Sequence, residues 1–147
     1  MPSRPRSGLA LLDVNVLVAL AWPNHQFHRA SQAFLGANRP WATCALTQLG
    51  FIRLSANPAA VTPAQTPSAA AELLAQLTAD PFHRDLDRLP APAGDACRAG
   101  FFAILGYRQV ADSYLLSLAA AQGAERVTVD RRIEHLAAGR QPVRVLG

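Results

Sequence analysis

The run Leu9–Leu12 constrains this chain most, because four consecutive apolar residues end abruptly at the carboxylate of Asp13. A strand that is apolar on both of its faces is typical of a buried parallel sheet. In α/β proteins, the edge formed by the C-terminal ends of such strands is where functional side chains collect. Asp13 is therefore a candidate functional residue as well as the end of a strand.

Strands and helices alternate along the rest of the chain, which predicts a parallel sheet in a three-layer α/β/α arrangement. We expect further strands at 41–44, 82–89, 126–129 and 143–146, with the stretch 82–89 at an edge of the sheet. We expect helices at 14–21, at 25–37 behind an Asn24 cap, at 47–55, from Thr66–Pro67 onward, at 95–105 and at 112–122. The prolines of residues 58–67 indicate a surface loop.

The length of 147 residues, half of them apolar, fits a single domain over 1–147, with residues 1–7 as a flexible tail. All 14 basic residues are arginines, and the sequence has no lysine. This excludes P-loop nucleotide hydrolysis, which needs a lysine on the phosphates, and argues against receiver domains and haloacid-dehalogenase-type phosphatases. The net charge of +4 permits an anionic partner such as nucleic acid but does not require one.

The chain is expected to be soluble and cytoplasmic. Cys44 and Cys97 have neither metal-ligand spacing nor enough partners for a disulfide framework, so they indicate small core residues in a reducing compartment. The apolar stretch 8–22 resembles an export signal, but Asp13 and Asn15 interrupt it. No stretch has the roughly 18 to 20 apolar residues of a membrane-spanning helix.

Three aspartates stand out by position. Asp13 and Asp130 each end an apolar strand, and Asp112 begins an apolar helix, so all three side chains can meet at one edge of a parallel sheet. Mg²⁺ and Mn²⁺ prefer such oxygen ligands, and without a metal the carboxylates repel one another, so removal of one is expected to stabilise the metal-free protein. Taken singly, Asp112 is equally explained as a helix cap and Asp130 as a turn residue.

Four segments containing these residues resemble motifs of PIN-domain ribonucleases, and specifically of the VapC toxins of bacterial toxin–antitoxin pairs. The segments occur in the family's order and extend over nearly the whole chain. They are Leu11–Leu17 (LLDVNVL), Thr47–Arg53 (TQLGFIR), Val110–Leu116 (VADSYLL) and Val127–Arg131 (VTVDR). Each motif alone is weakly specific, but four in order are a strong signal.

The resemblance implies a metal-dependent endoribonuclease that cleaves RNA phosphodiester bonds with Mg²⁺ or Mn²⁺. It implies that Asp13 and Asp112 are the main metal ligands and that Asp130 completes the acidic cluster. Asn15 and Thr128 would orient these carboxylates from behind. The resemblance further implies a homodimer, and a VapB-like antitoxin that holds the toxin inactive in a higher-order complex.

The second motif departs from the family pattern at Gln48, where a glutamate is usual. Gln48 still counts among the expected catalytic residues, because its amide oxygen can act as a ligand, but it brings no negative charge. This leaves open an alternative function, a catalytically weakened PIN-like module that binds RNA or protein. A doubly wound small-molecule binder is less well supported, since the chain has no glycine-rich phosphate loop.

Several basic side chains flank the acidic motifs, and they admit two explanations. Arg53, Arg108 and Arg131 are candidate RNA-binding residues, because guanidinium groups bind phosphates in a bidentate manner. These arginines, and Arg132 beside them, are equally explained as ion pairs that hold the acidic residues. His25 and His28, three residues apart, are better explained as caps or surface groups than as metal ligands.

Overall fold

The chain folds around a parallel five-stranded sheet. The computed structural model describes residues 8–36, 38–137 and 142–147; the predicted tail at 1–7 and residue 37 of the predicted helix 25–37 lie outside them. Every neighbouring pair of strands is parallel. In the spatial order β3-β2-β1-β4-β5, the strands are β3 (His83–Leu86), β2 (Trp41–Cys44), β1 (Ala10–Leu12), β4 (Glu125–Thr128) and β5 (Val143–Val145).

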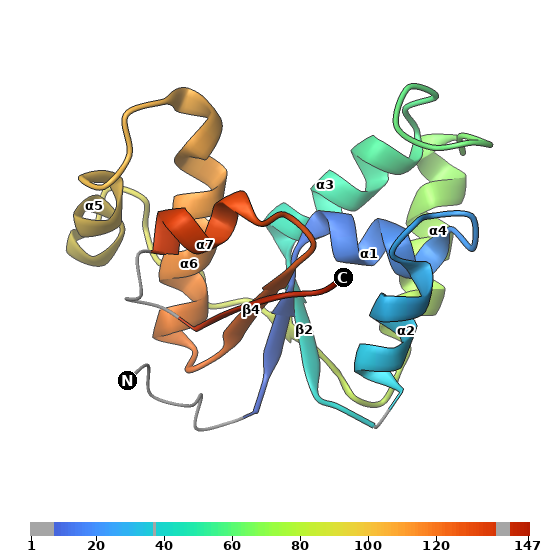
Figure 1. The fold of residues 1–147 in the computed structure, drawn as a ribbon, viewed down its shortest axis with the longest axis horizontal. Helices are drawn as coiled ribbons and strands as arrows, with labels where there is room; N and C mark the ends of the chain where they lie inside the picture. The colour runs from blue at the N-terminus through green and yellow to red at the C-terminus, as the bar shows by residue number, and fades with distance from the viewer. Residues whose placement is uncertain (1–7, 37, 138–141) are drawn as a thin grey trace.

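Helices cover both faces of this sheet, as Figure 1 shows. On one side lie α1 (Val14–Ala21), α2 (His28–Leu35), α3 (Ala45–Ser55) and α4 (Pro67–Thr78). On the other side lie α5 (Asp95–Phe101), α6 (Val110–Ala121) and α7 (Arg132–Ala137), with a short 3₁₀ helix at Tyr107–Gln109 before α6. The expected three-layer α/β/α class is confirmed. Among the described residues, no helix is both long and apolar enough to span a membrane.

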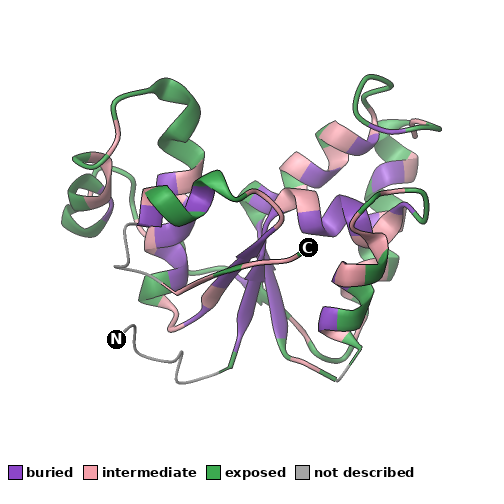
Figure 2. Ribbon diagram, in the orientation of Figure 1, coloured by how far each residue is buried: buried purple, intermediate pink, exposed green. Residues whose placement is uncertain are grey.

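Alternate residues of each central strand enter two separate cores, so the strands are buried on both faces (Figure 2). Leu12 and Trp41 pack with Phe51 of α3 in the core under α1–α4. Leu11 packs with Leu118 of α6 in the other core. Because β1 is buried on both faces, the residues of the run Leu9–Leu12 are all apolar and do not alternate with polar residues.

A close contact between α1 and α3 lies beside the end of β1. A Cβ atom added to Gly50 of α3 would lie 2.7 Å from a methyl carbon of Val14, so the two helices approach this closely only because residue 50 is glycine. Val14 is the first residue of α1 and directly follows Asp13. The contact therefore packs the start of α1, and the site residue before it, against α3.

The predicted starts of the helices at 25–37 and 112–122 and the predicted end of the helix at 95–105 are wrong. Asn24 does not cap α2, because turns extend as far as His28 and the Asn24 side chain donates to the carbonyl of Thr62 (3.1 Å). The predicted helix 95–105 ends at Phe101, and α6 begins at Val110 with Gln109 as its N-cap.

Asp112 therefore lies within the first turn of α6, and its explanation as a helix cap is wrong. The helix α7 was not expected from the sequence, because at six residues it is too short to show a helical periodicity.

Candidate functional site

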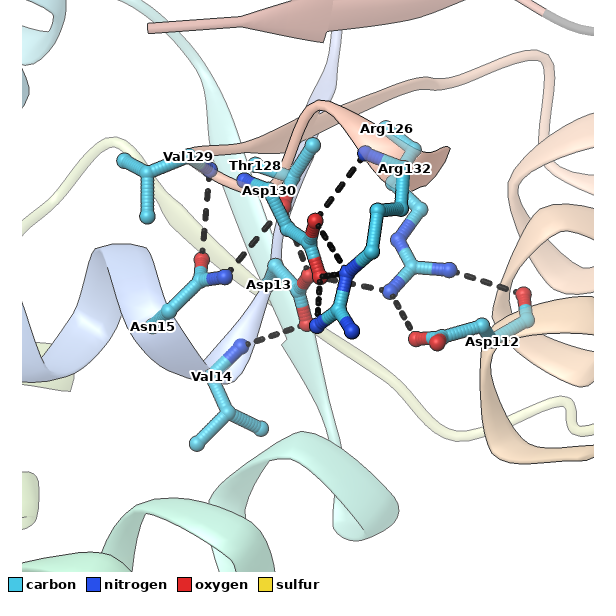
Figure 3. A network of polar contacts seen from close by, with 9 residues as sticks. All are labelled: Asp13, Val14, Asn15, Asp112, Arg126, Thr128, Val129, Asp130 and Arg132. Atoms are coloured by element: carbon cyan, nitrogen blue, oxygen red, sulfur yellow. Dashed lines mark hydrogen bonds and ion pairs between the residues drawn. The ribbon is translucent and has the colours of Figure 1, made fainter. Parts of the chain in front are cut away.

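The acidic residues meet where β1 and β4 end side by side. These strands pair in parallel with Leu12 opposite Val127, and the backbone N–H of Asp13 continues the ladder by donating to the carbonyl of Val127 (2.8 Å). Asp130 follows β4 by two residues, and the first turn of α6 brings Asp112 to the same place from the other side of the sheet (Figure 3). The acidic residues therefore meet at the C-terminal edge of the sheet, as the sequence predicts.

Asp13 is held by both of its carboxylate oxygens. Oδ1 accepts a hydrogen bond from the backbone N–H of Val14 (2.8 Å), so the side chain caps α1. Oδ2 accepts from the hydroxyl of Thr128 (2.8 Å). The negative charge also lies at the positive end of the dipole of α1, which stabilises the start of that helix.

Arg126 of β4 lies between the two carboxylates, and sequence reasoning missed it (Figure 3). Its Nη2 is 3.0 Å from Oδ2 of Asp13 and donates to Oδ1 of Asp112 at 2.8 Å. Its Nη1 donates to the main-chain carbonyl of Asp112 at 2.7 Å. A signal was available, because an arginine inside a strand that is expected to be buried must have a charged partner.

The guanidinium changes the electrostatics expected from the sequence alone. Asp13 and Asp112 converge on one nitrogen atom, so a positive charge already screens their mutual repulsion. Removal of one carboxylate would leave a fully buried arginine with less compensation rather than relieve a repulsion. The position of Arg126 therefore argues against the expectation that such a removal stabilises the metal-free protein.

Thr128 and Asn15 lie behind the carboxylates, in the place expected for orienting groups. The Thr128 hydroxyl donates to Asp13 and accepts hydrogen bonds from the Asn15 amide (3.3 Å) and the backbone N–H of Asp130 (3.0 Å). The Asn15 carbonyl accepts from the backbone N–H of Val129 (3.4 Å). One hydroxyl thus ties the ends of β1 and β4 together.

Asp130 has a different partner from the other two aspartates. Both of its carboxylate oxygens accept hydrogen bonds from the exposed guanidinium of Arg132, the shortest at 2.8 Å. The hydrogen bond to Arg132 is the main reason why the pKa of Asp130 is lowered. For Arg132, the ion-pair explanation is therefore the one that the structure supports.

Gln48 of α3 points to strand β2. Its amide nitrogen donates to the hydroxyl of Thr43 (2.9 Å), which also contacts Nε2 of His83 (2.8 Å). Burial lowers the pKa of His83. Among the hydrogen bonds of the described residues, the Gln48 side chain contributes this one and none to Asp13.

The three candidate RNA-binding arginines are all exposed, on α3, on the 3₁₀ helix and directly after Asp130. The guanidinium of Arg108 lies over the ring of Tyr107, 5.7 Å from its centre. The histidine at position 28 uses its ring to contact the carbonyl of Ala19 (2.7 Å), in line with a structural role.

The two carboxylates that meet at the end of β1 are of the donor type that divalent cations prefer. Two carboxylates from distant parts of the chain point to one position, and a positively charged nitrogen already lies there. Carboxylate oxygens are the ligands that Mg²⁺ and Mn²⁺ prefer. Within the part of the chain that the structure describes, no group of three His, Cys, Asp or Glu side chains is arranged to hold a metal.

Comparison with known proteins identifies the class to which this fold and site belong. The PIN domain family matches residues 10–139, which is most of the chain, so the chain belongs to the PIN domain family. Within it, the relatives are VapC ribonucleases of Mycobacterium tuberculosis. Ribonuclease VapC38 is 41% identical over 142 residues, covering 94% of this chain and 98% of the relative. Ribonuclease VapC39 is 38% identical over 127 residues, which cover 82% of this chain and 88% of the relative.

Solved structures support the same fold. The VapBC2 complex of Rickettsia felis, bound to a DNA fragment from its promoter, has a TM-score of 0.59 at 13% identity, covering 95% of this chain and 99% of the other. A second similar structure is that of VapC20 of Mycobacterium tuberculosis, a toxin that cleaves the sarcin–ricin loop. Its TM-score is 0.59 at 11% identity, and the match covers 86% of this chain and 93% of VapC20. The resemblance seen in the four sequence motifs is therefore confirmed.

Proposed function

We propose that this chain is a metal-dependent endoribonuclease that acts in the cytoplasm as the toxin of a toxin–antitoxin pair. The observation that carries the proposal is the convergence of Asp13, at the end of β1, and Asp112, at the start of α6, in a chain 41% identical to a ribonuclease. The similarity to a chain of the VapBC2 complex supports a VapB-like antitoxin as the partner. We also propose a homodimer, as the family resemblance implies.

In this proposal, Asp13 and Asp112 hold Mg²⁺ or Mn²⁺, and Asp130 completes the acidic cluster. The bound ion would lower the pKa of an attacking water and stabilise negative charge on the phosphate. Thr128 and Asn15 keep the Asp13 carboxylate in position through the hydrogen bonds described above.

The exposed guanidinium of Arg131, directly after Asp130, is available to a phosphate of the RNA backbone. Arg53 and Arg108, exposed on α3 and on the 3₁₀ helix, are further candidates for such contacts.

Cleavage should stop when the metal is removed. We expect the purified protein to cleave structured RNA in Mg²⁺ or Mn²⁺, to lose this activity in excess chelator and to regain it when metal is restored, because the groups that converge at the proposed site are the carboxylates of Asp13 and Asp112, which would activate water through a bound ion. Gel assays on transfer RNA, ribosomal RNA and a sarcin–ricin loop oligonucleotide measure this. Undiminished cleavage in chelator would contradict the metal mechanism, and RNA binding without cleavage would favour the alternative binding module.

Gln48→Glu should bind Mn²⁺ more tightly than the natural chain. The exchange is nearly isosteric and adds a negative charge, and the Thr43 hydroxyl can reverse its hydrogen bond to donate to the new carboxylate. Desolvation of the new carboxylate and its repulsion from the aspartates oppose this attraction. We therefore expect the free energy of Mn²⁺ binding to become more favourable by only about 1 to 2 kcal/mol, or roughly tenfold in affinity. Calorimetric titration measures it, with Gln76→Glu on the exposed surface of α4 as the matched control. Equal or weaker binding would mean that a negative charge at residue 48 does not act on the ion.

A further inference from the structure

Arg126 is the most deeply buried charged side chain at this site. The residue has 0% of its surface exposed, and its guanidinium contacts Asp13, directly after β1, and Asp112 in the first turn of α6. Its Nε has no hydrogen-bond partner among the described residues. An unpaired buried donor is costly, so the remaining contacts of the guanidinium must be strong enough to offset that cost.

We infer that Arg126 is a built-in competitor of the divalent cation: its Nη2 takes the position between Asp13 and Asp112 that a metal ion would share. The guanidinium keeps the two carboxylates together in the metal-free protein and weakens metal binding. This inference rests on the proposed metal site, and it concerns the affinity and stability of that site rather than the reaction catalysed there.

The contacts of the two carboxylates support direct competition. Oδ2 of Asp13 accepts from the Thr128 hydroxyl and faces Nη2 of Arg126, while Oδ1 accepts from the backbone of Val14. An ion that binds both carboxylates must therefore displace Nη2 or sit beside it. Displacement is unfavourable because the buried guanidinium loses its carboxylate acceptors, and binding beside Nη2 is unfavourable because the ion then lies close to a like charge in a poorly hydrated place.

The guanidinium is also held by a contact that does not involve the carboxylate groups. Nη1 donates to the main-chain carbonyl of Asp112 at 2.7 Å, and this acceptor belongs to the backbone of α6. Arg126 therefore stays anchored near the site even when its contacts with the carboxylates are broken. A competitor tethered in this way has a high effective concentration, which explains why it can oppose a divalent ion.

The experiment measures Mn²⁺ binding by the loss of the electron paramagnetic resonance signal of free Mn²⁺, together with thermal melting. Arg126→Met removes the charge and fills the space with a flexible apolar chain. Arg126→Gln also removes the charge but keeps N–H donors. Mn²⁺ binding can therefore still be measured on this variant if the methionine variant folds poorly. Both variants should melt at lower temperature than the natural chain in chelator. Both should bind Mn²⁺ about tenfold more tightly or better, with a larger rise in Tm on adding Mn²⁺.

Two controls separate competition from a general change in charge. Arg126→Lys keeps the positive charge and should keep Mn²⁺ binding weak. Arg144→Gln removes an arginine from the neighbouring strand β5, where it pairs with Glu125 outside the acidic cluster, and should leave Mn²⁺ affinity unchanged.

Equal or weaker Mn²⁺ binding by both the methionine and the glutamine variants would overturn the inference. In that case, metal-dependent cleavage by the natural chain would leave the proposed function standing. If neither the natural chain nor these variants bind Mn²⁺, the inference and the proposed metal site both fail.

Discussion

Asp112→Asn should reduce RNA cleavage by more than about a hundredfold, because groups that merely support metal ligands already contribute 10- to 100-fold to activity. Asparagine keeps the size of the side chain and leaves the bond from Arg126 to the main-chain carbonyl of Asp112 in place. It removes one of the two charges that converge on the proposed ion position. The loss should therefore appear in the rate of cleavage far more than in folding.

The measurement is the initial rate of RNA cleavage at saturating Mn²⁺, with a thermal melt of each protein alongside. Asp95→Asn is the matched control, because Asp95 is fully exposed on α5 and pairs only with the neighbouring Arg98 in the described structure. Cleavage within a few-fold of the natural chain by Asp112→Asn would show that Asp112 does not belong to the reaction centre.

Asp13→Ala should lower the free energy of unfolding of the metal-free protein by about 3 to 5 kcal/mol, the cost expected when one member of a buried ion pair is removed. The substitution leaves the guanidinium of Arg126 with Asp112 as its remaining carboxylate partner. It also removes the cap of α1 and the acceptor of the Thr128 hydroxyl. All three losses act in the same direction.

Chemical unfolding in excess chelator measures this effect, and Asp95→Ala provides the exposed comparison. The double variant Asp13→Ala with Arg126→Met tests the cause, because two changes in one ion pair should cost less together than their separate costs added. If Asp13→Ala is as stable as the natural chain or more stable, carboxylate repulsion dominates and the structural argument from Arg126 is wrong.

The environment of Gln48 could not be predicted from its motif. The sequence places it in the segment where the family usually has a glutamate, which implies a position facing the metal. The structure instead records its amide bonded to Thr43, whose hydroxyl also meets His83 of the edge strand β3. A motif specifies the helix and the position on it, whereas the direction of a long side chain depends on which polar groups the neighbouring strands offer.

Much of this protein is determined locally by its sequence. The continuous apolar run before Asp13, the alternation of strand and helix patterns and the order of the four motifs predict a parallel sheet with acidic residues at one edge. These features can be predicted because burial on both faces requires apolar residues at consecutive positions, and because parallel strands end at a common edge.

Tertiary structure alone decided which partner each charged group has. The hydroxyl of Thr128 bonds to Asp13 across 115 positions of sequence, and Arg126 joins that carboxylate to Asp112. Asp130 pairs with Arg132 instead, two residues away. Charges at a sheet edge have several possible partners of similar strength in the sequence, so the choice among them depends on distances of a few ångströms that only the packing of β1, β4 and α6 sets.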